Sequence, residues 1–308
     1  MSATSRSSPR KRSAYALLML LTLLWSSNWI FMKFALAHAH PVVFNANRAL
    51  LAVVTLFVWL ALTRRLRMPR AWWPIVITGL LQTTLNFGAT TMAVAGGGAG
   101  RASVLVFTMP FWTLLIAAPV LGERVRGSQW IAILLALAGL TLVVEPWNWQ
   151  GDLAARGWAV LSGFAWAAGT VATKYYQRDV ALDATNFIAW QMAAGVIPLV
   201  LMPLMHDYPA TQWSVTQVLL LIQVGVVSTA LGFLLWVVIL ERLPAGTASM
   251  NMLAIPVIAL VSSMIIFGET LSAVEWMGIA CIGAGLTLVT VRNLTARSRA
   301  TAKLRASA

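Results

Sequence analysis

Long apolar stretches recur along this sequence and constrain its fold more than any other feature. Each is about 20 residues long, enough for a helix to cross about 30 Å of hydrocarbon at 1.5 Å per residue. They lie at 14–36, 42–63, 72–95, 100–121, 128–147, 156–175, 185–205, 214–240, 246–267 and 274–291. Only 10% of the 308 residues are charged, whereas about a quarter are charged in a soluble domain. The sequence therefore predicts an all-α polytopic membrane protein with ten transmembrane helices.

The boundary between the third and fourth stretches is the least distinct. The run from Gly96 to Arg101 contains four glycines and no bulky side chain before the arginine. Glycine adopts backbone conformations that other residues avoid, so a run of glycines is typical of a tight turn. We predict that the chain reverses direction here, at the membrane interface.

The second half of the chain repeats the first. Residues 79–144 align with residues 225–290 at an offset of 146, and 20 of the 66 residues are identical. A weaker match at an offset of 141 pairs Trp25 with Trp166 and Asn45 with Asn186. The matches predict two five-helix repeats, at 14–147 and 156–291, between basic tails at 1–13 and 292–308. An internal duplication in a membrane protein is typical of a transporter.

The basic residues are distributed asymmetrically. Of the 22 Lys and Arg, 18 fall in the two tails and in every second loop, and only Lys33, Arg48, Arg101 and Arg156 fall elsewhere. The positive-inside rule then places both termini in the cytoplasm. Because each repeat has five helices, the second enters the membrane from the opposite side, so the repeats are inverted. The net charge of +13 follows from this topology, and we expect no nucleic acid as a partner.

Residues that support enzymatic chemistry are sparse in the sequence. It has one cysteine, Cys281, and no P-loop, zinc-protease or nucleophile-elbow motif. We therefore expect no enzyme activity, no cofactor and no metal. No Asp, Glu or His lies near the middle of a predicted span. This leaves two alternatives for transport: proton coupling through a carboxylate at the membrane interface, or facilitated diffusion down a metabolite gradient.

Polar and aromatic side chains inside the predicted spans are the candidates for substrate contact. A polar group in a bilayer costs free energy, so it faces a cavity or another polar group, and hydrogen bonding between helices is its alternative role. Aromatic rings commonly line ligand pockets, with packing as the alternative. The predicted substrate-binding residues are Trp25, Asn28, Gln82, Asn86, Trp166, Thr170, Phe233, Trp236 and Asn251.

Two prolines occupy matching positions in the middle of predicted spans. Pro110 lies in the fourth span, and Pro256 aligns with it in the ninth. A proline inside a helix removes a backbone donor and bends the helix, and interrupted spans in corresponding positions are typical of transporter sites. We predict that both prolines are hinges; the alternative is that they only shape a curved helix.

Four charged residues near the ends of predicted spans have two alternative roles each. Glu123 and Glu269 follow glycines at matching positions, where capping or pairing with a loop is expected rather than catalysis. Lys33 and Arg48 lie near the outer ends of the first two spans. They either contact a substrate carboxylate or extend to the lipid headgroups.

Three short motifs carry a resemblance to a known family. They are Trp25-Ser26-Ser27-Asn28-Trp29 followed by Lys33, Pro110 followed by Gly122-Glu123-Arg124, and Pro256 followed by Gly268-Glu269-Thr270. With the inverted duplication, the chain resembles the drug/metabolite transporter superfamily, specifically its EamA branch, over about residues 14–291. Two features depart from the family pattern: Ser26 replaces a glycine, and the glycine run at 96–100 replaces a more ordinary turn.

The resemblance implies a bacterial inner-membrane exporter of amino acids or related small metabolites. It places the pathway among the first, third, fourth, sixth, eighth and ninth helices, and we expect alternating access through a midplane cavity between the repeats. The expected partners are a small-molecule substrate and the lipid bilayer, and a homodimer is left open. The alternatives are a drug or nucleotide-sugar-type carrier of the same superfamily, or a membrane-embedded enzyme or sensor.

Overall fold

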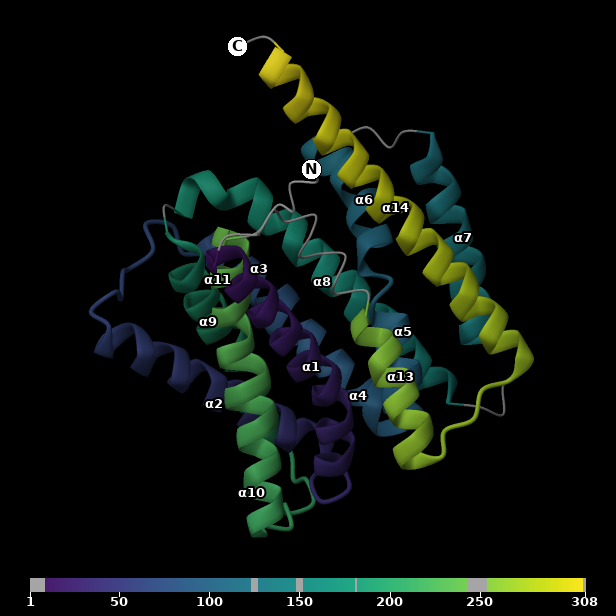
Figure 1. Ribbon diagram of the computed structural model, residues 1–308. Helices are drawn as coiled ribbons and strands as arrows, with labels where there is room; N and C mark the ends of the chain where they lie inside the picture. Colours follow the sequence, from purple (N-terminus) through teal and green to yellow (C-terminus); the bar gives the residue numbers. More distant parts are fainter. Residues whose placement is uncertain (1–8, 123–126, 148–151, 181, 243–253, 307–308) are drawn as a thin grey trace.

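The computed structural model describes residues 9–122, 127–147, 152–180, 182–242 and 254–306, and these form helices and connecting turns without strands (Figure 1). The first repeat contains α1 (Pro9–Leu36), α2 (Pro41–Leu62), α3 (Trp73–Gly79), the π-helix η1 (Leu80–Leu85), α4 (Asn86–Gly97), α5 (Ala99–Val106), α6 (Met109–Leu121) and α7 (Ser128–Val144). The second contains α8 (Leu153–Val180), α9 (Ala184–Met205), α10 (Val215–Ile222), the π-helix η2 (Gln223–Leu231), α11 (Gly232–Arg242), α13 (Ala254–Phe267) and α14 (Ala273–Ala306).

The helices have the length and composition of membrane spans. Five helical runs are long and apolar enough to cross a bilayer: Ser13–Leu36, Pro41–Leu62, Ala99–Leu121, Ala184–Met205 and Val215–Ile239. Shorter apolar helices lie at Gln129–Val144, Ala254–Phe267 and Ala273–Leu288. The protein is therefore an all-α, multi-pass membrane protein, as the sequence predicts; the number of ten spans stays a prediction.

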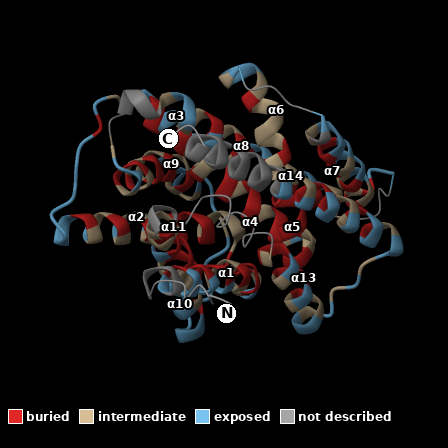
Figure 2. Ribbon diagram, turned by 45° about the horizontal axis from the view of Figure 1, so that its top comes forward, coloured by how far each residue is buried: buried red, intermediate tan, exposed pale blue. Residues whose placement is uncertain are grey.

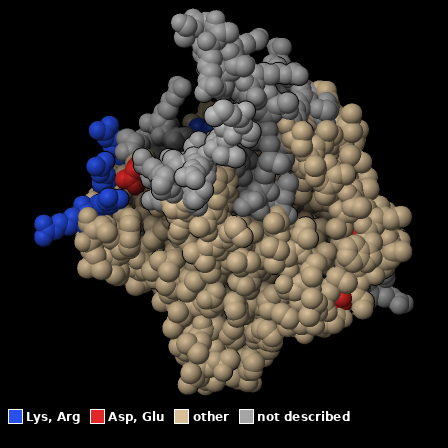
Figure 3. Space-filling model, viewed as in Figure 1, with Lys and Arg blue, Asp and Glu red and all other residues tan. Residues whose placement is uncertain are grey.

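The outer surface is suited to lipid. Large apolar side chains such as Met19, Leu23, Leu134 and Ile265 are exposed on the helices, while buried residues concentrate at the centre of the bundle (Figure 2). Exposed arginines gather in the loop after α2, at the left of Figure 1, and the face in Figure 3 is otherwise almost free of described charges. These arginines are Arg64, Arg65, Arg67 and Arg70.

The two terminal helices are longer than the predicted spans. Helix α1 begins at Pro9 and α14 continues to Ala306, so both helices extend into the segments predicted as basic tails. At 1.5 Å per residue, the 34 residues of α14 span about 50 Å, more than the hydrocarbon thickness of about 30 Å. The basic end of α14 therefore projects from the apolar layer.

The glycine run forms the predicted tight turn. Helix α4 ends at Gly97 and α5 begins at Ala99, so Gly98 alone joins them, with a φ of 87° that favours glycine. A Cβ atom at Gly98 would lie 2.6 Å from the Glu269 Oε1 atom. The position thus requires glycine for its conformation and for the approach of a carboxylate from the second repeat.

Within the described residues, three predicted spans are interrupted, and two of the interruptions occupy equivalent positions. Residues 80–85 of η1 align with residues 226–231, which lie inside η2. In η2 the Thr229 hydroxyl donates to the Val224 carbonyl five residues earlier, at 2.7 Å. The third break, at Phe107–Thr108, separates α5 from α6.

The break at Phe107–Thr108 has its physical cause in Pro110. The proline lacks a backbone N–H, and its ring clashes with the carbonyl four residues before it, which belongs to Val106, the last residue of α5. The structure therefore places Pro110 in the first turn of α6 rather than inside a continuous helix. Pro256 is buried in the first described turn of α13; the residues that precede Ala254 lie outside the described part.

The two repeats pack against each other reciprocally. Helix α1 contacts α11 and α13 of the second repeat, and its counterpart α8 contacts α4 and α6 of the first. Helices α7 and α14 are themselves counterparts and lie side by side (Figure 1). A Cβ atom at Gly139 would lie 2.5 Å from the Gly278 carbonyl oxygen, and one at Gly285 would lie 2.9 Å from that of Ala132. These two contacts are equivalent, since 139 aligns with 285 and 132 with 278, and they require α7 and α14 to run antiparallel.

Candidate functional site

A cavity of about 130 Å³ lies where the two repeats meet. Its walls come from α1, α2, α4, the break between α5 and α6, α8, η2, α11 and α13. Three pairs of its lining residues are repeat counterparts: Trp25 with Trp166, Phe87 with Phe233, and Met109 with Ile255. The lining consists of Trp25, Asn28, Trp29, Arg48, Asn86, Phe87, Thr90, Val106, Phe107, Met109, Trp166, Ser228, Thr229, Phe233 and Ile255.

Aromatic rings form one wall of this cavity. The ring centroids of Trp25 and Phe233 are 5.9 Å apart at an interplanar angle of 64°, and Trp166 stacks on Phe233 at 6.0 Å and 26°. The Trp25 indole N–H donates to the Ser228 carbonyl of η2 at 2.9 Å. The indole can approach η2 because Gly232 has no side chain: a Cβ atom there would overlap the Trp25 Nε1 atom. The wall presents flat apolar faces that suit an apolar ligand body.

Polar contacts hold α4 and α8 together beside the cavity. The Asn86 side-chain amide donates to the Ser162 hydroxyl at 2.8 Å and to the Ser162 carbonyl at 3.0 Å. The Thr90 and Ser162 hydroxyl oxygens are 2.6 Å apart. Asn86 thus performs the bridging role that was its alternative, while it also lines the cavity.

Among the described residues that line this cavity, Arg48 is the charged one. It lies in α2, is 4% exposed, and its Nε donates to the Asn45 Oδ1 atom at 2.9 Å. Its Nη1 lies 3.5 Å from the Met32 sulfur, and its Cζ lies 4.5 Å from the centroid of the Phe87 ring. Lys33, the neighbouring cation, instead donates to the Val94 carbonyl in the last turn of α4, at 3.1 Å.

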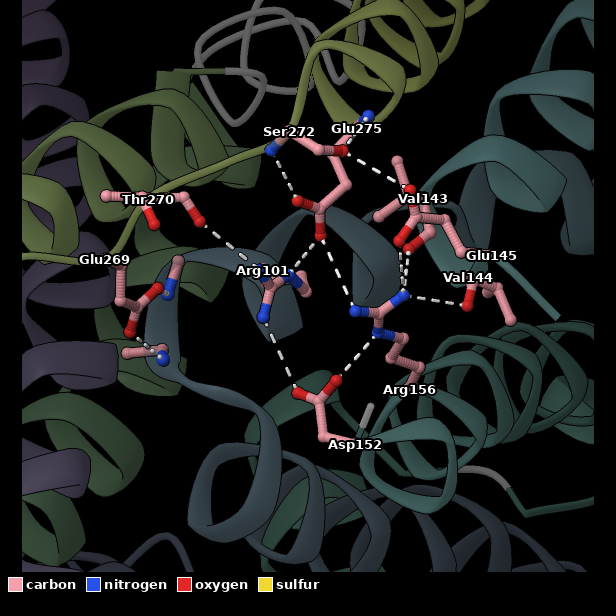
Figure 4. A network of polar contacts seen from close by, with 12 residues as sticks. Arg101, Val143, Val144, Glu145, Asp152, Arg156, Glu269, Thr270, Ser272 and Glu275 are labelled. Atoms are coloured by element: carbon pink, nitrogen blue, oxygen red, sulfur yellow. Dashed lines mark hydrogen bonds and ion pairs between the residues drawn. The ribbon is translucent and has the colours of Figure 1, made fainter. Parts of the chain in front are cut away.

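An ion-pair network closes one end of the bundle, where α5, α8 and α14 begin and α7 ends (Figure 4). The Arg101 guanidinium lies 2.5 Å from Glu275 and 3.5 Å from Asp152. The Arg156 guanidinium lies 2.8 Å from Asp152, 3.3 Å from Glu145 and 3.8 Å from Glu275. Arg101 and Arg156, both exceptions to the charge asymmetry, are therefore neutralised by carboxylates.

Glu269 adds a second link at the same end. Its carboxylate accepts hydrogen bonds from the backbone N–H groups of Ala99, at 2.9 Å, and Gly100, at 3.3 Å (Figure 4). The first N–H groups of a helix have no partner within the helix and favour an anion. The second repeat thus caps a helix of the first. Glu123, the counterpart of Glu269, lies outside the described residues.

Most of the sequence-predicted site residues come together. Trp25, Asn28, Asn86, Trp166 and Phe233 line the cavity. Gln82 donates to the Thr170 hydroxyl at 3.2 Å, one helical turn from Asn86 and Trp166, and neither residue of this pair is part of the lining. Trp236 contacts Trp25, with ring centroids 6.0 Å apart, and Asn251 lies outside the described residues.

Several lining residues were not among the predicted site residues. Phe87 has a sequence signal, because it is identical to its counterpart Phe233. Arg48 is predicted only with two alternatives, contact with a substrate carboxylate or with the lipid headgroups, and it lines the cavity. Val106, Phe107 and Met109 line the cavity because the helix breaks there, and apolar residues in an apolar span give no such signal by themselves.

Comparison with known proteins gives a consistent result. A model of the EamA-like transporter family matches the chain twice, over residues 12–145 and 154–291. The chain is 28% identical to the uncharacterized transporter YvbV of Bacillus subtilis over 297 residues. This alignment covers 95% of this chain and 96% of that protein. It is 25% identical to a probable amino-acid metabolite efflux pump of Salmonella typhimurium over 283 residues. This alignment covers 88% of this chain and 92% of that protein.

Two further similarities concern location and fold. The chain is 23% identical over 283 residues to the uncharacterized inner membrane transporter YedA of Escherichia coli, which covers 90% of each chain. A crystal structure of a protein that is 19% identical superimposes with a TM-score of 0.63, over 92% of this chain and 99% of that chain. At this identity the match shows a shared fold.

Proposed function

This chain belongs to the EamA-like transporter family, and from that premise we propose that it exports amino acids or related small metabolites across a bacterial inner membrane. Family membership makes the protein a transporter and not an enzyme. The substrate class follows the amino-acid metabolite efflux pump to which the chain is similar. The inner membrane follows from the similarity to YedA.

We propose that the chain crosses the membrane ten times as two inverted repeats, with both termini in the cytoplasm. The placement of 18 of the 22 basic residues supports this orientation. The antiparallel contact between α7 and α14 supports the inversion, because counterpart helices of inverted repeats run in opposite directions. In this orientation the ion-pair network and the Glu269 cap face the outside.

The observation that carries the proposed mechanism is the cavity built from counterpart residues of both repeats. A site at the repeat interface, beside interrupted helices, can become accessible from either side when one repeat rocks against the other. Its volume of about 130 Å³ is below the roughly 300–1,000 Å³ of common ligand pockets. We propose that the cavity widens when the repeats rock and that Pro110 and Pro256 mark the hinges.

The remaining candidate residues fit the inner mouth of this pathway. Gln82 and Thr170 lie one turn beyond Asn86 and Trp166, in the direction of the α3 N-terminus and the α8 C-terminus, and Trp236 lies one turn beyond the cavity along α11. The proposed topology places all three on the cytoplasmic side. We propose that they contact the substrate as it enters.

A metabolite-resistance screen tests the export function. The protein is overexpressed in a bacterium, and growth is measured with toxic concentrations of single amino acids and their analogues. We expect rescue by the wild-type protein and its loss in Asn28→Ala, because Asn28 lines the cavity. Ser27→Ala is the matched control, since the Ser27 hydroxyl donates within its own helix, to the Leu24 carbonyl. Unchanged rescue by Asn28→Ala at normal membrane levels would contradict this site.

A further inference from the structure

Arg48 is a cation inside the membrane with no carboxylate beside it. It lies seven residues into α2, about 10 Å along the helix axis from its first residue. In the described part of the chain, no Asp or Glu lies within ion-pair distance of its guanidinium. A charge inside a membrane segment is unfavourable and therefore marks a functional position.

The partners of Arg48 are neutral and leave part of its guanidinium free. Asn45 accepts from Nε, and the Met32 sulfur is a weak acceptor beside Nη1. These two contacts use Nε and Nη1 and do not involve Nη2. Arg156, which is also buried, and Arg101, which is half-buried, differ, since each is paired with carboxylates. A guanidinium presents paired N–H groups that match a carboxylate, so Arg48 is equipped to bind one that enters the cavity.

Asn28 supplies the complementary group in the same cavity. Its Oδ1 atom is buried and has no hydrogen-bond partner. A buried acceptor without a donor is unfavourable, and an ammonium group would satisfy it. Both groups belong to the first repeat alone, because the counterpart of Arg48 is Ala189 and that of Asn28 is Gly169. The symmetric aromatic wall thus carries an asymmetric pair of polar groups.

We propose that the cavity binds a small zwitterion, with its carboxylate on Arg48 and its ammonium group on Asn28 Oδ1. The apolar body of this ligand packs against the rings of Trp25, Trp166 and Phe233. This inference rests on the proposed export function and narrows its substrates to molecules that carry both charges. Analogues that lack either charge leave Arg48 or Asn28 without its partner.

Binding to purified full-length protein tests the two contacts separately. Titration calorimetry compares L-leucine with L-leucinamide, which lacks the carboxylate, and with 4-methylpentanoate, which lacks the ammonium group. The wild-type protein should bind leucine more tightly than either analogue by about tenfold or more. Arg48→Gln should weaken leucine binding and leave leucinamide binding unchanged. Asn28→Leu should weaken leucine binding and leave 4-methylpentanoate binding unchanged.

The ratio of the leucine affinity to the affinity for each analogue separates a lost contact from misfolding. A folding defect weakens the binding of all three ligands together. Arg48→Lys retains the positive charge but lacks the paired N–H groups of the guanidinium, so its affinity for leucine should lie between those of Arg48→Gln and the wild-type protein. The same comparison with alanine and phenylalanine and their amides covers other body sizes. Equal affinity for amino acids and amides, an unchanged ratio in Arg48→Gln, or no binding of any of the three amino acids would overturn the proposal.

Transport into proteoliposomes distinguishes this inference from the export function. Transport of leucinamide at the rate of leucine would overturn the zwitterion site and leave export intact. Binding with the expected pattern, without transport of any amino acid, would overturn export and leave the zwitterion site intact.

Discussion

Beside the cavity, Asn86 and its repeat counterpart Gly232 contribute to packing in different ways. In the first repeat, Asn86 donates to Ser162 and joins α4 to α8. Its counterpart in the second repeat is Gly232, where the missing side chain makes room for the Trp25 indole. The indole then donates to Ser228. A glycine at the first position or an asparagine at the second would remove a contact that the other half does not replace.

We expect Gly232→Ala to destabilise the protein by about 1–3 kcal/mol, the range for overpacking a close contact. The added methyl group would displace Trp25 and break its hydrogen bond to Ser228. Thermal unfolding in detergent measures the effect. Gly157→Ala is the control, because a Cβ atom there would meet nothing within 4 Å. A Gly232→Ala protein that melts at or above the wild-type temperature would contradict the packing described for Trp25.

The candidate site was predictable where a residue was exceptional in its surroundings. Asn28 and Asn86 are polar in apolar spans, and Trp25 and Trp166 match between the repeats, and all four line the cavity. Gln82 and Thr170 are equally exceptional, yet they hydrogen-bond to each other one turn away. Periodicity gives the face of a helix but not the depth at which a cavity ends. Depth depends on packing between distant helices, which the sequence does not display locally.

At the scale of elements, the sequence predicts the apolar segments better than their interruptions. The described parts of the ten segments are helical apart from the break at Phe107–Thr108 and a few residues at segment ends, and the turn at Gly98 follows directly from the glycine run. Pro110 signalled the break at Phe107–Thr108, because its missing donor acts on its own helix. The π-helical turns η1 and η2 have no comparable residue. In a π-helical turn each backbone hydrogen bond spans five residues instead of four. This change costs little free energy locally, so packing against neighbouring helices determines where it occurs.

The ion-pair network joins elements that are distant in sequence. Arg156 of α8 contacts Glu145 at the end of α7 and Glu275 at the start of α14. It also donates to the Val144 carbonyl at 2.9 Å, one of the carbonyls that a helix end leaves without partners. One guanidinium therefore fastens the last helix of each repeat to the first helix of the second.

We expect Arg156→Met to lower the free energy of unfolding by roughly 3 kcal/mol or more, since removing one partner of a buried ion pair leaves the other charges uncompensated. Arg156→Lys should lose less. Arg70→Met is the control for loss of a positive charge, because Arg70 is exposed in the loop after α2. Urea or thermal unfolding in detergent compares the variants. Equal stability of Arg156→Met and Arg70→Met would show that the network does not hold the helices together.

At the scale of the whole molecule, the distribution of titratable groups bears on the energy source for transport. None of the described residues that line the cavity is Asp, Glu or His. Four carboxylates at the proposed outer end are engaged, three with Arg101 or Arg156 and Glu269 with backbone N–H groups, and Asp207 is exposed in the loop after α9. A proton carrier needs a group that gains and loses its proton as access alternates. The arrangement favours facilitated diffusion over proton coupling.

We therefore expect transport into proteoliposomes to follow the substrate gradient without an imposed pH gradient. Rates are compared at pH 7 on both sides and with one side acidified, with a substrate identified by the resistance screen. Empty liposomes under the same gradient give the leak. Strict dependence on the pH gradient would contradict facilitated diffusion and direct attention to the carboxylates of the outer network.

The Glu269 cap also has a consequence for how the protein is made. The N–H group of Ala99 and its acceptor on Glu269 are 170 residues apart in the chain. At about 5–20 residues per second, a ribosome needs roughly 10–30 seconds to synthesise that distance. During this interval, α5 is present without its cap, and the delay between synthesis of Arg101 and of its partner Glu275 is slightly longer. The first half of the protein must remain in the membrane unfinished until the second half arrives, so a release from the ribosome near residue 150 would leave an exposed, uncapped helix end for quality-control proteases.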